Sequence, residues 1–423
     1  MSDFGVQRAR YNKSLDTPSA EGYLQMVGLP TNASTEARDA ALAGIAGKRC
    51  WHLSALMMTI FPVLLSISGL AAAQDIPTGF VDTVRRADAA REAGEGATAI
   101  QLYEEAERVN PKWPDGWFFL GSLQYGANSY AAARDALTRY IDLTQNATAA
   151  FALRGLCEFE LEQLPQSLID IQRGLALGAA NQPRNEQILR YHEALLLTRF
   201  GRYEDALQSY GYFARTGVSS PDIFLGLGLA GLRLPLLPKD VATDQQDLLI
   251  ATGNAAYQAL TGENDDKAQQ AFSKLFQRFP AEAKAHYLYG YLLFAKEPDH
   301  AVAEFKRASE LAPASASPQA MLAWSSLVRN ESLEAVPYAE RAVKNDPSLA
   351  LAQLVLGRSL VETGNVKDGI DHLQRALQIE PNNLEVHLAL ARGYSEAGRP
   401  QDARRERLIC LQVTADEANQ IAH

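Results

Sequence analysis

The sequence predicts an all-α fold in which helix-turn-helix repeats stack into a solenoid. Two observations predict this fold. One complete repeat can be read between Leu349 and Asn383, where two short amphipathic helices follow each other. Prolines also recur at intervals of 33, 34 and 34 residues, at Pro280, Pro313, Pro347 and Pro381. A fixed period indicates one elongated array, rather than the two or three globular domains that 423 residues would otherwise allow.

The complete repeat shows why each helix begins and ends where it does. Leu356 and Leu360 are four residues apart, so they share one face of the first helix, and Gly364 ends that helix because glycine tolerates positive φ. The second helix carries its apolar stripe at Gly369, Leu373, Ala376 and Leu377. Pro381 then stops the helix, since proline has no backbone N–H.

A small residue opens each second helix, twelve positions before the proline that ends it. The pairs are Ala99 with Pro111, Ala268 with Pro280, Ala301 with Pro313, Ala335 with Pro347, and Gly369 with Pro381. A helix-turn-helix unit with a period of about 34 residues resembles the tetratricopeptide repeat. Two repeats match the family's signature positions best. The matching residues are Trp117, Leu120, Gly121, Ala133 and Leu137 in one repeat, and His286, Tyr289, Gly290, Ala301, Phe305, Ala308 and Pro313 in the other.

The resemblance implies a right-handed α-solenoid of about nine units, several of them degenerate. Repeats are expected near 80–113, 114–147, 148–181, 187–220, 249–282, 283–315, 316–349, 350–383 and 384–417. They form an N-terminal array, 80–220, and a C-terminal array, 249–417, on either side of a degenerate repeat, 221–248. The small signature residues have a packing reason, because only Gly, Ala or Ser leaves room where two helices cross closely.

Residues 221–248 break the pattern. Leu227 and Gly228 carry the signature of a first helix, but Pro235 and Pro238 forbid a regular helix where the second one should begin. We expect an extended apolar loop packed on the solenoid, and then a helix from about Asp244 to Leu260. The segment is interpreted as an eroded repeat whose loop covers its neighbours. A hinge that divides the array into two lobes is the alternative.

The residues before the repeats are expected to have a separate role. Residues 1–47 are polar and lack apolar periodicity, so they read as a disordered extension or a mis-assigned start. Residues 48–73 read as a signal peptide or membrane anchor, because two basic residues precede an apolar run and three alanines. We favour cleavage before Gln74, although the run is about long enough to span a hydrocarbon core of roughly 30 Å. The protein is therefore expected to be exported and periplasmic or secreted, or alternatively anchored by residues 53–73.

Charge and cysteine usage exclude some classes of partner and linkage. The net charge is −10 and the pI is about 5.3, whereas a general nucleic-acid binder needs a basic face, so no nucleic-acid partner is expected. Cys157 and Cys410 are far apart in the sequence, and distant positions of a linear array do not meet. We interpret both as small buried hydrophobes rather than as a disulfide.

Motifs for catalysis, cofactors or metals do not fit their surroundings. Gly226 to Gly231 match G-x-G-x-x-G, but that motif works between a strand and a helix, and here helical repeats surround it. His192-Glu193 lacks the second histidine of H-E-x-x-H, since Leu196 stands there. His286 and His387 fall at equivalent repeat positions, which favours packing. We expect no catalytic residue, no cofactor and no metal site.

The family resemblance implies where a ligand would bind. In tetratricopeptide arrays, the second, fifth, ninth and twelfth positions of each first helix line a concave groove that holds peptides. Here these positions carry aromatic side chains and then two arginines: Phe118, Tyr125, Phe159, Tyr257, Tyr287, Tyr291, Phe294, Trp324, Arg358 and Arg392. Aromatic side chains bury a large area on binding while losing few rotamers, and the arginines at the end of the groove could bind a carboxylate. The alternative is that the aromatic residues only pack between neighbouring repeats.

Two functions follow from this interpretation. The first is a non-catalytic scaffold of the cell envelope that holds a partner protein or an extended peptide in its groove. The second is an accessory or regulatory subunit of an envelope enzyme complex, such as a glycosyl transferase or peptidase. The fold alone does not fix the ligand, and the sequence leaves the partner and the oligomeric state open.

Overall fold

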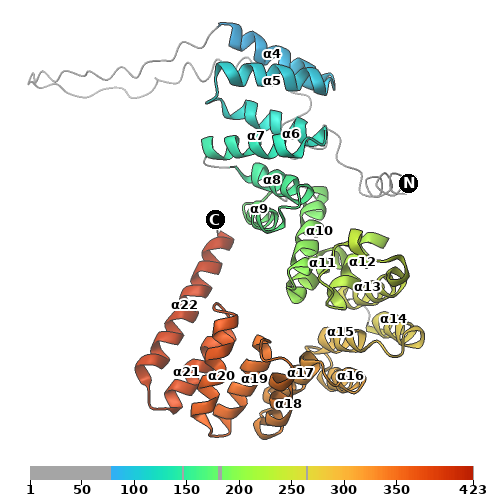
Figure 1. Cartoon of the computed structure of the whole chain (residues 1–423), viewed down its shortest axis with the longest axis vertical. Coiled ribbons are helices and arrows are strands. Elements are labelled where there is room, and N and C mark those ends of the chain that lie inside the picture. The colour runs from blue at the N-terminus through green and yellow to red at the C-terminus, as the bar shows by residue number, and fades with distance from the viewer. Residues whose placement is uncertain (1–77, 145–146, 180–182, 263–264, 423) are drawn as a thin grey trace, which may run out of the picture. The chain divides into compact units, whose positions relative to one another are not determined.

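The computed structural model describes residues 78–144, 147–179, 183–262 and 265–422, which form helices joined by turns and loops (Figure 1). The all-α prediction is confirmed. The expected extension, 1–47, and the expected signal or anchor, 48–73, lie outside these residues. None of the helices in the described ranges is both long and apolar enough to cross a membrane. The chain divides into two compact units, unit 1 (Met1–Asn185) and unit 2 (Glu186–His423).

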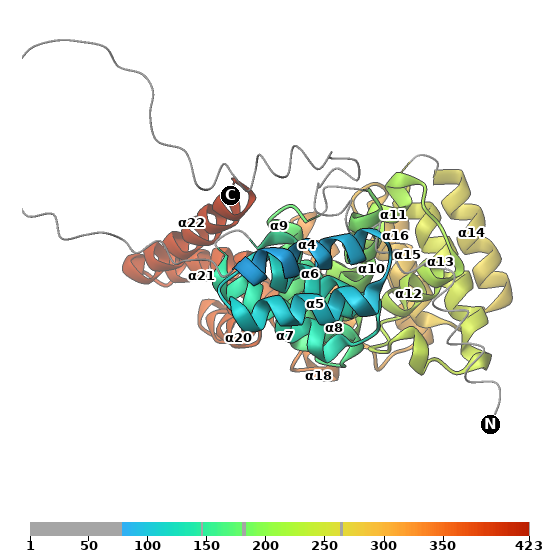
Figure 2. The same cartoon turned by 90° about the horizontal axis from the view of Figure 1, so that it is seen from above.

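Three helical hairpins stack in the described part of unit 1. They pair α4 (Thr78–Glu92) with α5 (Gly96–Val109), α6 (Pro114–Gly126) with α7 (Tyr130–Leu143), and α8 (Thr148–Glu160) with α9 (Leu164–Ala176). Figures 1 and 2 both show α4 and α5 side by side. A partly buried ion pair joins the two helices of the last hairpin, since Arg154 on α8 donates to Asp170 on α9 over 2.5 and 3.0 Å. Cys157 is a free, fully buried thiol on α8.

Unit 2 continues the helical repeats after a helix that spans the boundary. That helix is α10 (Pro183–Arg199), and Ser209 on α11 donates to Glu193 on it over 3.0 Å. The helices that follow are α11 (Tyr203–Thr216), α12 (Pro221–Gly231), α13 (Gln246–Leu260), α14 (Asp265–Arg278), α15 (Ala283–Leu293), α16 (Pro298–Leu311), α17 (Ala316–Val328), α18 (Ser332–Asn345), α19 (Ala350–Glu362), α20 (Val366–Ile379), α21 (Leu384–Glu396) and α22 (Pro400–Ala422). We call the earlier helix of each hairpin its first helix and the later one its second helix.

The small signature residues lie where the two helices of a hairpin cross. A Cβ added at Gly357 would come 2.7 Å from the Gly369 carbonyl oxygen, and one at Gly290 would come 3.0 Å from that of Ala301. Contacts under 3.0 Å are essentially never made by a real Cβ, so glycine is required at the closest crossings. The packing reason inferred from the sequence is confirmed at these positions.

One residue with positive φ reverses the chain between the helices of most hairpins. Gly364 has φ of +93°, and Asn128 and Asn330 take the same left-handed region at +57° and +62°. Arg233, directly after α12, also has φ of +53°, and the Leu234 N–H donates to the Leu229 carbonyl over 2.9 Å. The chain therefore starts a normal hairpin turn after α12, just before the two prolines.

The prolines replace the expected second helix with a loop. Two short 3-10 turns, Pro238–Asp240 and Thr243–Gln245, lie in this loop, and Leu237 is 4% exposed. α13 then packs directly on α12, because a Cβ at Gly228 would come 2.0 Å from the Leu249 carbonyl oxygen. α13 thus closes the hairpin that α12 begins, and it also pairs with α14. The G-x-G-x-x-G sequence lies wholly within α12, without the strand that a dinucleotide site needs.

A polar contact near the start of the first helix recurs in three repeats. The Trp117 Nε1–H, the Gln353 Nε2–H and the His387 Nε2–H each donate to the carbonyl of the proline six residues earlier, over 3.0, 2.8 and 3.0 Å. His387 Nδ1 also lies 2.7 Å from Glu406 Oε2, and His286 Nδ1 lies 2.6 Å from Glu304 Oε2. Both histidines therefore tie a first helix to its second helix.

Candidate functional site

The structure divides the predicted groove residues between the two units. Phe118 and Tyr125 lie on α6 and Phe159 on α8, all in unit 1. Phe118 is 7% exposed and belongs to a core that also contains Phe151, whereas Tyr125 is half-buried with its ring 5.5 Å from that of Tyr130. Phe118 thus has little area left for a ligand. That these three residues bind a peptide stays a prediction.

The predicted aromatic residues of α13 and α15 differ in how much surface they offer. Tyr257 and Tyr287 are each 7% exposed, and the Tyr257 hydroxyl donates to the Phe213 carbonyl over 3.3 Å. Tyr291 and Phe294 are only partly buried. Burial raises the pKa of Tyr291, and the nearby charge of Glu204 acts in the same direction. Tyr291 is therefore the tyrosine of this group best placed to meet a ligand.

An arginine from the interrupted repeat packs among these tyrosines. The Arg233 guanidinium lies 4.8 Å from the ring centroid of Tyr203 and 5.5 Å from that of Tyr287, and its Nη1 lies 2.5 Å from Glu204 Oε1. A cation over an aromatic face is attracted by the ring quadrupole. These contacts join α11, the end of α12 and α15, so they hold the interrupted repeat to its neighbours.

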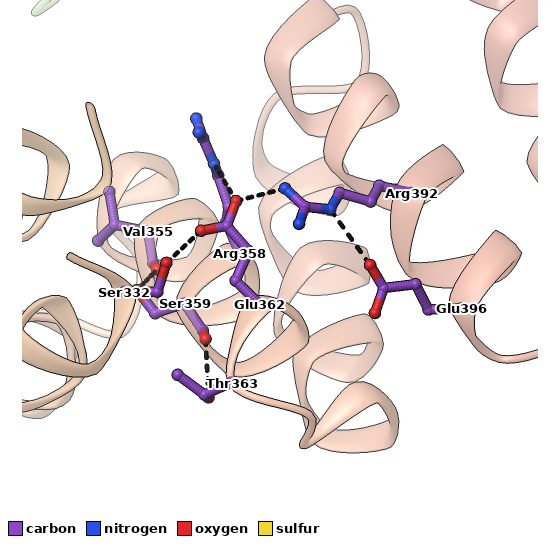
Figure 3. Close-up of polar contacts among 8 residues, drawn as sticks. All are labelled: Ser332, Val355, Arg358, Ser359, Glu362, Thr363, Arg392 and Glu396. Carbon is purple, nitrogen blue, oxygen red and sulfur yellow. Dashed lines mark hydrogen bonds and ion pairs between the residues drawn. The ribbon is translucent and has the colours of Figure 1, made fainter. Parts of the chain in front are cut away.

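The structure brings together the last three residues of the predicted groove, which lie on three successive first helices. Trp324 is on α17, Arg358 on α19 and Arg392 on α21. The Arg358 guanidinium lies 5.4 Å from the Trp324 ring centroid. Arg358 Nε and Arg392 Nη1 both donate to Glu362 Oε1, over 3.1 and 2.6 Å (Figure 3). We call Trp324, Arg358, Glu362 and Arg392 the arginine cluster.

Glu362 is the electrostatic centre of the arginine cluster. Its side chain is only 9% exposed, and the Ser332 hydroxyl donates to its second oxygen. Burial acts to raise the pKa of Glu362, but the hydrogen bonds from Ser332 and Arg358 and the two arginine charges outweigh it, so the pKa lies below its ordinary value. Glu362 is therefore an anion that holds both arginines in position.

Part of the arginine cluster remains available to a ligand. Arg392 also donates from Nε to Glu396 over 3.3 Å, so each arginine has a carboxylate partner. Arg358 uses only Nε within the described residues, and its terminal nitrogens point away from Glu362 (Figure 3). Two parallel N–H groups of this kind match a carboxylate in a bidentate pair. The cluster can therefore accept an acidic group beside the Trp324 ring.

Several residues of these sites were not singled out from the sequence. Glu362 and Glu396 follow Arg358 and Arg392 by four positions, and this helical spacing could have identified them. Ser332 and Arg233 carry no such signal. Ser332 reaches Glu362 only because consecutive hairpins stack. The position of Arg233 depends on the loop that replaces a second helix after α12.

A separate cavity of about 620 Å³ lies between α5, α6 and α7 in unit 1. Glu107 lines it and is 3% exposed. Burial raises the pKa of Glu107 to about 8, although the Trp117 backbone N–H acts to lower it. Its oxygens are shielded, and a Cβ at Gly116 would lie 2.0 Å from one of them. This carboxyl is therefore packed between helices rather than presented to a ligand.

Comparisons with known proteins identify the repeats. Profiles of the tetratricopeptide repeat family match residues 84–148 and 360–406. The first range covers most of the first two hairpins, and the second runs from the end of α19 through α20 and α21 into α22. A comparison with curated protein sequences found no match.

The similarity to solved structures is low, both in sequence identity and in TM-score. A crystal structure of MamA is 19% identical, with a TM-score of 0.34, over 38% of this chain and 96% of that chain. A MamA structure from Desulfovibrio magneticus RS-1 is 17% identical, with a TM-score of 0.34, over 39% and 94%. YrrB, described as a TPR protein with an unusual peptide-binding site, is 17% identical, with a TM-score of 0.34, over 44% and 92%. At these values the likeness says nothing about a ligand of this chain.

Proposed function

Because the chain carries tetratricopeptide repeats, we propose that it is a non-catalytic protein-interaction scaffold. The proposed ligand is a peptide segment of a partner protein, which lies across the first helices α17, α19 and α21. This segment carries an acidic residue for the arginine cluster and an apolar residue beside it.

The arginine cluster is the observation that supports this proposal most. It contains side chains from three successive first helices, and the pairing of Arg392 on α21 with Glu362 on α19 fixes their spacing. A ligand that contacts all of them must be extended along the stack. Arginine and tryptophan are also the residue types that most often dominate binding energies at protein interfaces.

An exposed leucine extends the proposed surface with an apolar contact. Leu388 is 49% exposed and lies four residues before Arg392 on α21, so the two share one helix face. A large aliphatic side chain in water can be covered by a partner, and its full burial is worth roughly 1.5–3 kcal/mol. Leu388 and Arg358 thus provide an apolar and a charged contact within one surface.

The proposed location is the cell envelope. It rests on the basic, apolar and small-residue segments of residues 48–73, which match a secretory signal in order and length. N-terminal sequencing of the protein from its native cells tests this point. A mature terminus at Gln74 supports export with cleavage, and an intact chain in the cytosol contradicts it.

The binding proposal is tested with a photo-crosslinking amino acid at Leu388 in the full chain. We expect one protein to be crosslinked in native cells, with a yield that falls at least tenfold on Arg358→Ala. Arg307→Ala, on the second helix α16, is the matched control, because this arginine is also paired with a glutamate and lies outside the proposed surface. Its yield should equal that of the unmodified chain. Crosslinks that do not depend on Arg358, or none above background, contradict the proposal.

A further inference from the structure

In regular repeats, the preceding second helix covers one face of the next first helix. On α8, Ala150, Leu153 and Cys157 are buried in one core with Ala133 and Leu137 of α7. On α19, Ala352 and Val355 are buried with Ala335, Ala339 and Ala342 of α18. The covered residues lie five and two positions before the signature glycine, Gly155 or Gly357, and on α8 also two positions after it. Small apolar side chains therefore mark this face where it is covered.

The corresponding face of α13 is open and polar. Ala256 holds the signature position there, twelve residues before Ala268, so the equivalent residues are Ala251, Asn254 and Gln258. These three line a groove of about 330 Å³ between α13 and α14. Asn254 is exposed, whereas its counterpart Val355 on α19 is fully buried. The face that regular repeats cover is thus accessible on this hairpin.

The interruption after α12 explains why none of the described helices covers this face. Pro235 and Pro238 prevent the second helix that would precede α13. α12 packs on another face of α13, where Leu249 and Gly253 meet it. On α14, Phe272 stacks on Tyr289 of α15 at 4.1 Å, on the side away from the groove. In both views α14 lies at the outer edge of unit 2 (Figures 1 and 2).

The ionisable residues that line this groove are all basic. Lys267, Lys274 and Arg278 lie along one face of α14, and the amides of Gln270, Asn254 and Gln258 complete the polar lining. Lys274 has no ion pair within the described ranges, and Arg278 pairs with the exposed Asp247. Such a concentration of cations stands out in a chain of net charge −10. A ligand with carboxylates is the complement of this surface.

We propose that the α13–α14 groove binds an acidic amphipathic helix of a partner protein, in the place that a second helix occupies in regular repeats. Ala251, Ala271 and Leu275 provide a narrow apolar floor on which small side chains of that helix pack. Its carboxylates pair with Lys274 and Arg278 and accept hydrogen bonds from the amides.

The spacing of the cations favours a helix over a compact anion. Lys267, Lys274 and Arg278 are seven and four residues apart, so they extend over roughly 16 Å of α14 at about 1.5 Å per residue. A single phosphate group could contact Lys274 and Arg278, which are helical neighbours, but it would not reach Lys267 as well. A helix laid along α14 can present a carboxylate every three or four residues and meet all three.

The test is a selection of displayed 14-residue helical peptides with randomised surface positions. The full chain is the bait, and the Lys274→Glu/Arg278→Glu chain is the counter-selection, which removes peptides that bind elsewhere. Both replaced residues are exposed, and circular dichroism checks that the variant keeps its helical content. Lys344→Glu on α18 is the matched control, because it makes the same charge change at an exposed position outside the groove.

We expect the enriched peptides to carry Asp or Glu on one face and to bind the unmodified chain at least tenfold more tightly than the double variant. Lys344→Glu should leave their affinity unchanged, and replacing their acidic residues by amides should abolish the preference. Neutral or basic peptides, or peptides that bind the double variant equally well, overturn the proposal. Arg358→Ala should not alter this binding, so the result is independent of the arginine cluster.

Discussion

The junction between α18 and α19 and the region from α12 to α14 show two ways of continuing a helical stack. At the regular junction, Val355 is fully buried against alanines of the preceding second helix. In the interrupted region, the equivalent Asn254 is exposed in a basic groove. One period of chain therefore either closes a face or leaves it open, depending on whether a second helix forms.

In the interrupted region, α13 belongs to two hairpins at once. It crosses α12 at Gly228 as a second helix would, and it pairs with α14 as a first helix does. The stack continues without a gap in the backbone packing, although one helix is missing. One face of α13 is left uncovered by the other described helices, and the groove on that face has a mostly polar lining.

The largest change in the free energy of unfolding is expected when the valine of the regular junction is replaced by the asparagine of the interrupted region. Val355→Asn should lower the free energy of unfolding by about 4 kcal/mol, because it removes buried apolar surface and leaves a buried amide without partners. Asn254→Val should change it by less than about 0.5 kcal/mol, since that position is exposed. Urea denaturation followed by circular dichroism measures both. A stabilisation above about 1 kcal/mol by Asn254→Val would mean that the face is covered after all.

The helix crossings provide the next comparison. A Cβ at Gly228 would meet the Leu249 carbonyl oxygen at 2.0 Å, whereas one at Gly357 would meet that of Gly369 at 2.7 Å. Gly228→Ala should therefore destabilise the fold by about 3 kcal/mol and Gly357→Ala by about 1 kcal/mol.

Gly126→Ala is the control for both crossings. Apart from its own helix backbone and chain neighbours, no described atom lies within 4 Å of a Cβ at that glycine, so alanine gains helix propensity without a clash. Its unfolding free energy should stay the same or rise slightly. Equal losses at Gly228 and Gly357 would show that α12 and α13 are no closer than a regular hairpin.

The smallest effect concerns the arginine cluster of the regular region. The folded pKa of Glu362 lies below its unfolded value, so its contribution to stability is present above the unfolded pKa and is lost as the pH falls through the folded pKa. Glu362→Gln should cost about 1 kcal/mol at neutral pH and make stability less dependent on pH between about pH 5 and pH 3. Glu396→Gln, at a more exposed position, is the control for the charge change. An unchanged acid dependence in Glu362→Gln would contradict the role given to this carboxylate.

Most of the fold could be predicted from the sequence, because the same steric requirements for glycine and proline recur from repeat to repeat. Gly364 adopts positive φ where the first helix was expected to end, and α20 ends at Ile379, two residues before Pro381. The helix expected from about Asp244 begins at Gln246. The pairing of α12 with α13 was not predicted, because the two are separated by a loop that no repeat pattern describes. The chain divides into two compact units at residue 185, and the two arrays expected on either side of 221–248 stay a prediction.

The candidate site could be predicted only in part. The period placed Trp324, Arg358 and Arg392 on three successive first helices. In the structure the Arg358 guanidinium lies over the Trp324 ring, and both arginines donate to Glu362. The same period could have predicted Glu362 as their link, since Arg392 follows Arg358 by 34 residues and Glu362 lies between them on the same face. Burial was harder to foresee. Phe118 and Tyr287 match the groove pattern but are 7% exposed, because the packing of neighbouring helices decides which side of an aromatic ring remains open.

The hydrogen bond from Trp117, Gln353 or His387 to the preceding proline carbonyl bears on how such a chain grows. Donor and acceptor are six residues apart but lie in successive repeats, because the proline ends one repeat and the donor lies near the start of the next. A repeat copied into a new position would therefore renew the contact wherever the repeat before it ends in such a proline. Three different side chains act as the donor, so the contact needs an N–H group rather than one residue type. Lengthening of the array by copying is thereby compatible with a satisfied contact at each new boundary.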